Sequence, residues 1–317
     1  GQLLETMLIN LITYNSNVAT KCSRVKYAGG DKEIVDFGAR RAHGRDAANA
    51  LAYAGYLTGF QGTATVEAGV NYSIPLFGTM AHSYIMSFEN ELDAFRCYAD
   101  EFPDSCTLLV DTYDTISGVE KAIVVAKELR SRGDNLKAIR LDSGDYLSLS
   151  LESRGMLDAA GFQDVSIVVS GGLDEFRISE LESKNAPIDI YGVGTRIAVV
   201  EDTPWLDSVY KMSAIDSRPV NKTSEGKSSY PHKKNVFRKY SPEGQFIEDL
   251  IVADTTPPKI SESRGLLTTF IEDGKILREH PGLKASRNHF LDQFSKLDSP
   301  YKSIQGSPNY PVSINLR

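Results

Sequence analysis

An alternation of short apolar runs and helical segments constrains the fold of this chain more than any other feature of its sequence. Between residues 34 and 196 the pattern repeats about seven times, at intervals of roughly 25 residues. The apolar runs are mostly continuous, which is typical of strands that are buried on both faces. Strands joined by helical crossovers pair in parallel. The pattern therefore predicts a parallel α/β sheet.

Polar residues at the ends of the apolar runs indicate which type of parallel α/β fold is present. The runs that we interpret as strands are Ile34–Arg41, Gly59–Gly69, Ile74–Phe77, Thr107–Thr115, Leu136–Asp145, Val165–Glu175 and Ile188–Thr195. Each ends in or near Gly, Asp, Arg, Ser or Thr, as in an α/β barrel whose site lies at the carboxyl ends of its strands. A doubly wound open sheet is the alternative. A dinucleotide site is disfavoured because no GxGxxG motif follows a first strand.

The segments on either side of this pattern differ from it. Residues 3–26 have helical periodicity, with a break expected near residues 15–17, and the amphipathic pattern is already under way at residue 1, so a preceding segment is expected. We predict three parts: an N-terminal helical segment (1–33), a barrel (34–200) and a C-terminal part of a second domain (201–317). The last part should contain a helix after Gly282, an irregular arm after Ser299, and antiparallel strands at Ser208–Ile215, Asn235–Tyr240, Phe246–Val252 and Leu266–Ile271.

The composition excludes several classes of function. The formal net charge of −7 over 317 residues disfavours duplex nucleic acid as a general partner. Three cysteines without metal-ligand spacing fit a reducing cytoplasm better than a disulfide scaffold. No run approaches the roughly 18 apolar residues that a membrane helix requires.

His82 is the first candidate for chemistry. The apolar run from Ile74 ends at Gly78-Thr79, and His82 then opens a helical pattern that continues to Tyr98. An imidazole at a helix N-terminus can meet a phosphate, whose charge the helix dipole also favours. The alternative is that His82 only caps the helix or fills a polar corner.

Charged residues follow other predicted strands. Asp111, Asp142 and Asp145 can hold Mg²⁺, which proteins bind with one or two carboxylates and substrate phosphates. Arg40 and Arg140 offer planar forks for a carboxylate or a phosphate. The alternatives are strand-end capping and an internal ion pair between Arg140 and Asp142.

Two late strands lead into glycine turns, Ser170-Gly171-Gly172 and Gly192–Thr195. Backbone N–H groups in such turns bind phosphate, and late strands are its usual position in barrels. The alternative is that these glycines only permit tight turns. Lys222, Ser224 and Lys227 form a cationic loop, which is either an anion clamp or a solvated surface.

Taken in order, these motifs resemble a known family. DFGARR, GFQGTATVEAG, GTMAHS, LLVDTYDT, IRLDSGD, SGGLDE, GVGT and KTSEGK, over roughly residues 34–240, resemble the nicotinate phosphoribosyltransferases. The resemblance implies a type II phosphoribosyltransferase fold, an irregular or incomplete α/β barrel with a second α+β domain. It also implies that nicotinate and 5-phosphoribosyl-1-pyrophosphate give nicotinate mononucleotide and pyrophosphate in NAD biosynthesis. ATP hydrolysis is coupled through a phosphohistidine, and Mg²⁺ is the cofactor.

The resemblance also assigns roles to residues. His82 matches the phosphorylated histidine, and Asp111 and Asp142 match acids near the ribose and the Mg²⁺-pyrophosphate. The residues implied for substrate binding are Arg40, Thr63, Ala64, Thr79, Ser83, Arg140 and Ser143. Those implied for phosphate binding are Ser170, Gly171, Gly172, Gly192, Gly194, Thr195, Lys222, Ser224 and Lys227.

Ala64 bears on the choice of substrate. Nicotinamide-using relatives carry an acid at this position, which suits an amide and repels a carboxylate, so alanine favours nicotinate. Nicotinamide or quinolinate transfer, or a non-catalytic phosphoribosyl-binding protein, are the alternatives. A Schiff-base aldolase is disfavoured because no lysine follows a predicted barrel strand. The resemblance implies a homodimer, the cysteine usage favours a cytoplasmic location, and the family's N-terminal segment with a ring-stacking tyrosine is expected outside this chain.

Overall fold

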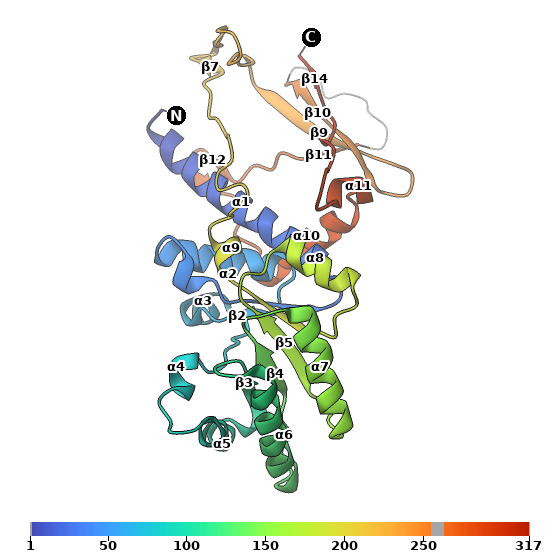
Figure 1. The fold of residues 1–317 in the computed structure, drawn as a ribbon. Coiled ribbons are helices and arrows are strands. Elements are labelled where there is room, and N and C mark those ends of the chain that lie inside the picture. Colours follow the sequence, from blue (N-terminus) through green and yellow to red (C-terminus); the bar gives the residue numbers. More distant parts are fainter. Residues whose placement is uncertain (1, 255–262, 317) are drawn as a thin grey trace. The chain divides into compact units, whose positions relative to one another are not determined.

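The computed structural model describes residues 2–254 and 263–316 (Figure 1). The described residues form two compact units. The larger unit is Asn15–Pro204, and the smaller combines the residues up to Tyr14 with those from Trp205 onward.

Six parallel strands form the sheet of the larger unit, within the part of the chain that the structure describes. They are β1 (Glu33–Asp36), β2 (Gly62–Thr63), β3 (Thr107–Leu109), β4 (Ala138–Leu141), β5 (Ser166–Ser170) and β6 (Ile190–Val193), in the order β2-β1-β6-β5-β4-β3. From β3 to β6 each strand pairs with the next strand along the chain, β6 pairs with β1, and β1 pairs with β2. In a doubly wound sheet, by contrast, the strand order proceeds in both directions from the first strand. The predicted α/β barrel is confirmed, and it is incomplete because β2 and β3 do not pair.

The third of the seven predicted strands is wrong. Ile74–Phe77 does not form a strand, and Leu76 makes a single isolated parallel bridge with Thr63. Pro75 has no N–H to donate to a ladder. The predicted strand at Gly59–Gly69 is also shorter than expected, because most of its second half is helix α3 (Val66–Tyr72).

Helices connect the strands. Besides α3, they are α1 (Glu5–Ala28), α2 (Arg45–Thr58), α4 (His82–Ile85), α5 (Glu91–Glu101), α6 (Thr115–Ser131), α7 (Tyr146–Ala159), α8 (Glu175–Ser183) and α9 (Thr195–Ala198), with short 3-10 turns at Gln2–Leu4, Ala39–Arg41 and Pro103–Ser105. The predicted break near residues 15–17 is wrong, since α1 is continuous. The single helix predicted from His82 to Tyr98 is two helices, because Asn90 accepts a hydrogen bond from the Asp93 backbone N–H (3.0 Å) and starts α5.

The core of the larger unit lies between the sheet and the helices that cover it. Helices α5, α6 and α7 are neighbours, and α6 and α7 pack on β4 (Figure 1). Leu108 and Ile139 of the strands and Leu129 and Leu157 of the helices are fully buried. Gly118 lets α6 approach β3, because a Cβ there would collide with the Val110 carbonyl.

The smaller unit has a mixed four-stranded sheet. Strands β9 (Lys234–Tyr240), β10 (Phe246–Ala253), β11 (Ser263–Gly265) and β14 (Val312–Asn315) lie in the order β11-β9-β10-β14. β10 and β14 are parallel, and the other pairs are antiparallel. Two small hairpins and two helices complete the described part of this unit: β7 (Ala214–Ile215) with β8 (Arg218–Pro219), β12 (Ile271–Glu272) with β13 (Lys275–Ile276), α10 (Leu283–Ser295) and α11 (Ser299–Lys302).

The predictions for this C-terminal segment are correct in part. β9, β10 and the helix after Gly282 are confirmed. Of the predicted strands at Ser208–Ile215 and Leu266–Ile271, only residues 214–215 and 271 are in strands. The tail after Ser299 was expected to be irregular, but it contains α11 and β14.

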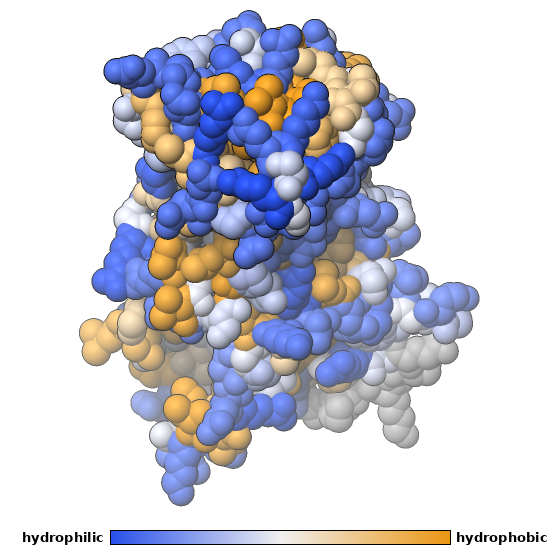
Figure 2. All heavy atoms as spheres, turned by 90° about the horizontal axis from the view of Figure 1, so that it is seen from below, coloured by the Kyte–Doolittle hydropathy of each residue, from blue (hydrophilic) through white to orange (hydrophobic). Residues whose placement is uncertain are grey.

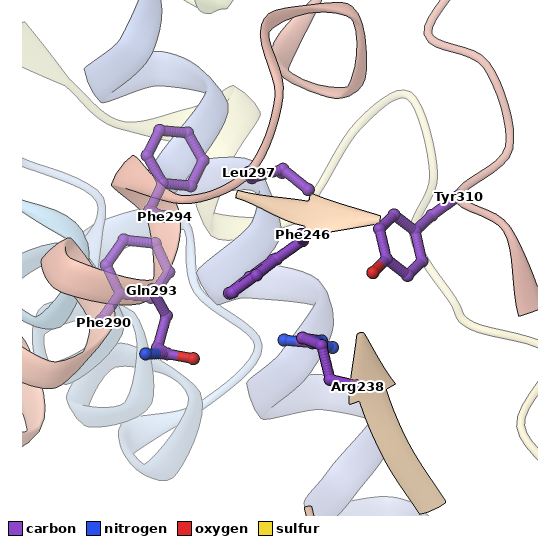
Figure 3. Close-up of a pocket in the computed structure, with 7 residues that line it drawn as sticks. All are labelled: Arg238, Phe246, Phe290, Gln293, Phe294, Leu297 and Tyr310. Atoms are coloured by element: carbon purple, nitrogen blue, oxygen red, sulfur yellow. The ribbon is translucent and has the colours of Figure 1, made fainter. Parts of the chain in front are cut away.

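A pocket of about 260 Å³ lies within the smaller unit (Figure 3). Its walls are mostly aromatic, and its lining residues are Arg238, Phe246, Phe290, Gln293, Phe294, Leu297 and Tyr310. Arg238 donates to both oxygens of Asp249 (2.7 and 2.8 Å), Tyr310 donates to Asp249 (3.4 Å), and Gln293 donates to Asp292 (2.9 Å). Each polar side chain of this pocket therefore already has a protein partner.

The surface is mixed. The face in Figure 2 is mostly hydrophilic, with apolar side chains gathered in small patches. Every helix in residues 2–254 and 263–316 is too short or too polar to cross a membrane. All three cysteines are free thiols.

Candidate active site

His82 is the first residue of α4, and it lies against two strand ends. Its Nδ1 is 3.1 Å from the Thr112 hydroxyl, which follows β3, and its Nε2 is 3.7 Å from an Asp142 oxygen, which follows β4. The side chain is 40% exposed. One ring nitrogen is therefore within hydrogen-bond distance of a hydroxyl, the other faces a carboxylate beyond that distance, and the ring is still accessible from solvent.

Arg140, at the end of β4, connects three segments. Its guanidinium donates to the hydroxyls of Ser170 (2.8 Å) and Thr79 (2.7 Å) and to the carboxylate of Asp142 (2.5 Å). Its planar fork suits several acceptors at once. The residues before α4 are thus tied to the ends of β4 and β5.

Asp142 is held as a carboxylate. Burial raises its pKa, but the Arg140 charge and hydrogen bonds from Ser170 and Arg140 outweigh burial, so the pKa lies below the usual value. The Ser170 hydroxyl bonds the same oxygen that Arg140 contacts. The other oxygen of Asp142 faces His82.

Asp111 follows β3, and only one of its two carboxylate oxygens accepts hydrogen bonds from described residues. One carboxylate oxygen accepts from the Asp142 N–H (3.1 Å) and the Ser143 hydroxyl (2.5 Å). The other oxygen is buried and has no hydrogen-bond partner, which is unusual for a native protein. No group of three or more metal-ligating side chains occurs in the described residues. This donor set fits Mg²⁺ bound mostly by substrate phosphates and water, not a metal enclosed by protein.

The turn after β5 requires glycine. Gly171 and Gly172 have φ of +92° and +63°, and a Cβ on Gly171 would collide with the carbonyl oxygen of Asp142. The Tyr146 hydroxyl lies 3.0 Å from that same carbonyl and 2.7 and 2.8 Å from the carbonyls of Ser170 and Gly171. Burial raises the pKa of Tyr146 to about 12, so its hydroxyl remains a donor. The turn is therefore packed onto the Arg140–Asp142 segment.

The predicted turn Gly192–Thr195 is shorter than expected, because Gly192 and Val193 are the last residues of β6, and the end of this strand lies beside Phe37, which follows β1. A Cβ on Gly192 would collide with the Phe37 ring, and the Phe37 N–H donates to the Val193 carbonyl (2.7 Å). The Phe37 ring also lies under Arg140, with the guanidinium 5.4 Å from its centroid. The ends of β1, β4, β5 and β6 are thus brought together, as the sequence predicts.

Asp36 is a buried carboxyl group behind this rim. It is 1% exposed, and it accepts from the Gly38 N–H (2.7 Å) and the Thr63 hydroxyl (2.6 Å). Burial raises its pKa to about 6, although both hydrogen bonds oppose the shift. Thr63 is fully buried, so its hydroxyl serves Asp36, whereas Ala64 beside it is exposed.

The remaining predicted site residues have different surroundings. Arg40 and Ser83 are not buried, and neither forms a side-chain hydrogen bond or ion pair with another described residue. Gly194 precedes α9, and Thr195 is its exposed first residue. Lys222, Ser224 and Lys227 lie in an exposed loop of the smaller unit. Asp145 accepts a hydrogen bond from Ser148 (2.6 Å), which agrees with a capping role.

Three residues of the cluster, namely Asp36, Thr112 and Tyr146, were not predicted from the sequence. Asp36 and Thr112 lie inside the DFGARR and VDTYDT motifs, but only their neighbours were assigned roles. Tyr146 directly follows the IRLDSGD motif. Their roles depend on contacts with distant segments, which no spacing in the sequence encodes.

Fold and cluster together define an α/β-barrel enzyme whose site is built on the carboxyl ends of its strands. Residues 32–248 match the nicotinate phosphoribosyltransferase (NAPRTase) family. The chain belongs to this family.

Individual relatives agree with this assignment. The chain is 42% identical to a nicotinate phosphoribosyltransferase of Mycobacterium tuberculosis over 321 residues, which cover 100% of this chain and 68% of the relative. It is 36% identical to the Bacillus subtilis nicotinate phosphoribosyltransferase over 343 residues, covering 99% and 70%. The crystal structure of human nicotinic acid phosphoribosyltransferase matches with a TM-score of 0.88 at 25% identity, covering 99% of this chain and 75% of that one.

Proposed function

We propose that this chain transfers the phosphoribosyl group of 5-phosphoribosyl-1-pyrophosphate to nicotinate, giving nicotinate mononucleotide and pyrophosphate in NAD biosynthesis. Membership of the family supports the proposal. The structural observation that carries it is the Arg140 fork, which joins Thr79, Ser170 and Asp142 beside His82. Segments distant in sequence thereby form one polar surface.

The reaction separates charge at the ribose. The bond from C1 to the pyrophosphate oxygen breaks, the sugar becomes cationic, and the ring nitrogen of nicotinate forms the new bond. The carboxylates of Asp111 and Asp142 stabilise positive charge, and the glycine turns after β5 and β6 hold the 5′-phosphate through backbone N–H groups. Asp111, through its unpaired oxygen, and Asp142 would hold Mg²⁺, which neutralises the departing pyrophosphate when it is bound.

His82 couples the reaction to ATP. An imidazole nitrogen attacks the γ-phosphorus, the bond to the ADP oxygen breaks, and water later hydrolyses the phosphohistidine. Its exposed side chain and its two polar neighbours support this role. The phosphorylated imidazole would add negative charge and acceptor oxygens beside Arg140.

Arg40 and Ala64 select nicotinate. Arg40 has no partner among the described residues, so its fork is available to the pyridine carboxylate. Ala64 is exposed and neutral, so it does not repel that group. The ratio of kcat/KM for nicotinate, nicotinamide and quinolinate tests this choice, and a preference for nicotinamide or quinolinate would contradict it.

The location and assembly of the protein belong to the same proposal. Three free thiols, of which Cys97 is exposed, are compatible with a reducing cytoplasm. We expect a homodimer, which sedimentation equilibrium tests. The cationic loop of Lys222, Ser224 and Lys227 would bind phosphate groups of the substrates.

Labelling with ATP tests the role of His82. The native protein should take up acid-labile phosphate from γ-labelled ATP and release pyrophosphate in the presence of nicotinate and the sugar donor. His82→Ala should take up none, whereas His43→Ala, which alters a histidine outside the cluster, should label like the native protein. Equal labelling of His82→Ala would contradict the phosphohistidine. Binding of the sugar donor by the native protein without pyrophosphate release would favour a non-catalytic homologue.

A further inference from the structure

One ion pair joins the segments that follow the two glycine turns. The Arg196 guanidinium donates to a carboxylate oxygen of Asp174. Asp174 comes two residues after Gly172, and Arg196 comes two residues after Gly194. The pair therefore links the ends of β5 and β6 just beyond the two turns.

Asp174 is fixed on both of its oxygens. One accepts from the Arg177 N–H (2.8 Å) and caps α8, and the other accepts from Arg196. The side chain of Asp174 is 9% exposed, and that of Arg196 is 42% exposed. A buried carboxylate is costly without a partner, so loss of Arg196 would also disturb the start of α8.

Arg196 is also engaged elsewhere. Its Nε lies 3.2 Å from a Glu201 oxygen, and its backbone carbonyl accepts from the Glu201 N–H (3.0 Å). Two carboxylates thus share this guanidinium. The hydrogen bond and charge of Asp174 raise the pKa of Arg196, so the guanidinium keeps its charge throughout the neutral pH range.

We propose that Asp174 and Arg196 are positioning residues that fix the spacing of the two glycine turns, and so set the affinity for a sugar phosphate. The inference rests on the proposed function, in which both turns bind the 5′-phosphate. Two turns that contact one phosphate must keep a constant separation, and β5 and β6 pair only as far as Ser170 and Gly192. Beyond these residues no backbone hydrogen bonds of the ladder join the two segments, and the ion pair between Asp174 and Arg196 connects them instead.

A double-mutant cycle tests the inference. Asp174→Asn retains an oxygen that can cap α8, but it removes the charge and replaces the oxygen that accepts from Arg196 by an NH2 group. Arg196→Met removes the guanidinium and keeps an unbranched side chain. Binding of ribose 5-phosphate is measured by calorimetry, and KM and kcat are measured with 5-phosphoribosyl-1-pyrophosphate.

Each single variant should weaken ribose 5-phosphate binding by about five- to tenfold, and the double variant should be no weaker than either single one. KM for the sugar donor should rise by the same factor while kcat stays within about twofold, because ground-state and transition-state binding are lost equally. Arg196→Lys, which can still donate to Asp174, should recover part of the affinity. Glu201→Gln removes the charge of the other partner of Arg196 and should change binding by less than about twofold.

Several results would overturn the inference. If Asp174→Asn binds normally or more tightly while Arg196→Met binds weakly, Arg196 contacts the phosphate itself. If the two effects add in the double variant, the residues act independently. A native protein that binds no sugar phosphate refutes the proposed function and the inference together, whereas normal binding by both single variants refutes the inference alone. Far-UV circular dichroism of each variant verifies folding, and Arg196→Lys decides the case if Arg196→Met does not fold.

Discussion

Replacing Asp36 by asparagine should change how stability depends on pH. Asp36 is buried at the end of β1, and burial raises its pKa from 3.8 to about 6. A carboxyl group with a higher pKa in the folded than in the unfolded protein favours folding while it is protonated. This contribution is complete below about pH 4 and is lost as the pH rises through 6.

The magnitude follows from the size of the shift. At 1.36 kcal/mol per pKa unit, the change from 3.8 to about 6 corresponds to about 3 kcal/mol. About 2 kcal/mol of this falls between pH 4.5 and 7. The side chain of the Asp36→Asn variant would still accept from Gly38 but would lose the bond from Thr63, a cost of about 1 kcal/mol that does not vary with pH. The native free energy of unfolding, minus that of the variant, should therefore fall by about 2 kcal/mol over this range.

Urea unfolding followed by far-UV circular dichroism at several pH values measures this difference. Asp145→Asn serves as a control, since the Ser148 hydrogen bond lowers the pKa of Asp145 below its ordinary value of 3.8, and its contribution is therefore lost only as the pH falls below about 4. The native-minus-Asp145→Asn difference should stay nearly constant between pH 4.5 and 7. A native-minus-Asp36→Asn difference that stays constant from pH 4.5 to 7, or rises, would refute the reasoning.

Two further predictions concern the turn after β5 and the Arg140 fork. Gly171→Ala should lower the free energy of unfolding by about 3 kcal/mol, because this position combines a positive φ with a collision of the added Cβ. Gly172→Ala should lower it by only about 1 kcal/mol, because no atom lies within 4 Å of the added Cβ. Equal losses in urea unfolding would contradict this prediction. Arg140→Lys keeps the charge but cannot donate to Ser170, Thr79 and Asp142 at once, so kcat/KM should fall at least about tenfold, and a fully active variant would show that charge alone suffices. Arg140→Met should in addition raise the pKa of Asp142 and move the acidic limb of the pH–rate profile to higher pH.

The strand ends were predictable because each depends on a local signal. An apolar run followed by Asp, Arg or Gly marks Asp111, Arg140 and Gly171, and the parallel fold then places such residues on one edge. The pairing of β6 with β1 was not local, and it followed only from the interpretation as a barrel. Thr112 and Tyr146 were missed because their partners are 30 and 24 residues away.

The largest difference between the sequence prediction and the structure concerns the segment that positions His82. The prediction placed His82 at the end of a barrel strand, but Ile74–Phe77 is joined only to β2, through the Thr63 N–H to the Pro75 carbonyl and the Phe77 N–H to the Thr63 carbonyl. Within the described residues no ladder connects this segment to β3. Side chains hold it there instead, through Arg140 with Thr79 and Met80 and through Thr112 with His82. His82 therefore depends for its position on the same polar groups that would surround its substrate, and we expect substrate binding at Arg140 to change the orientation of the imidazole.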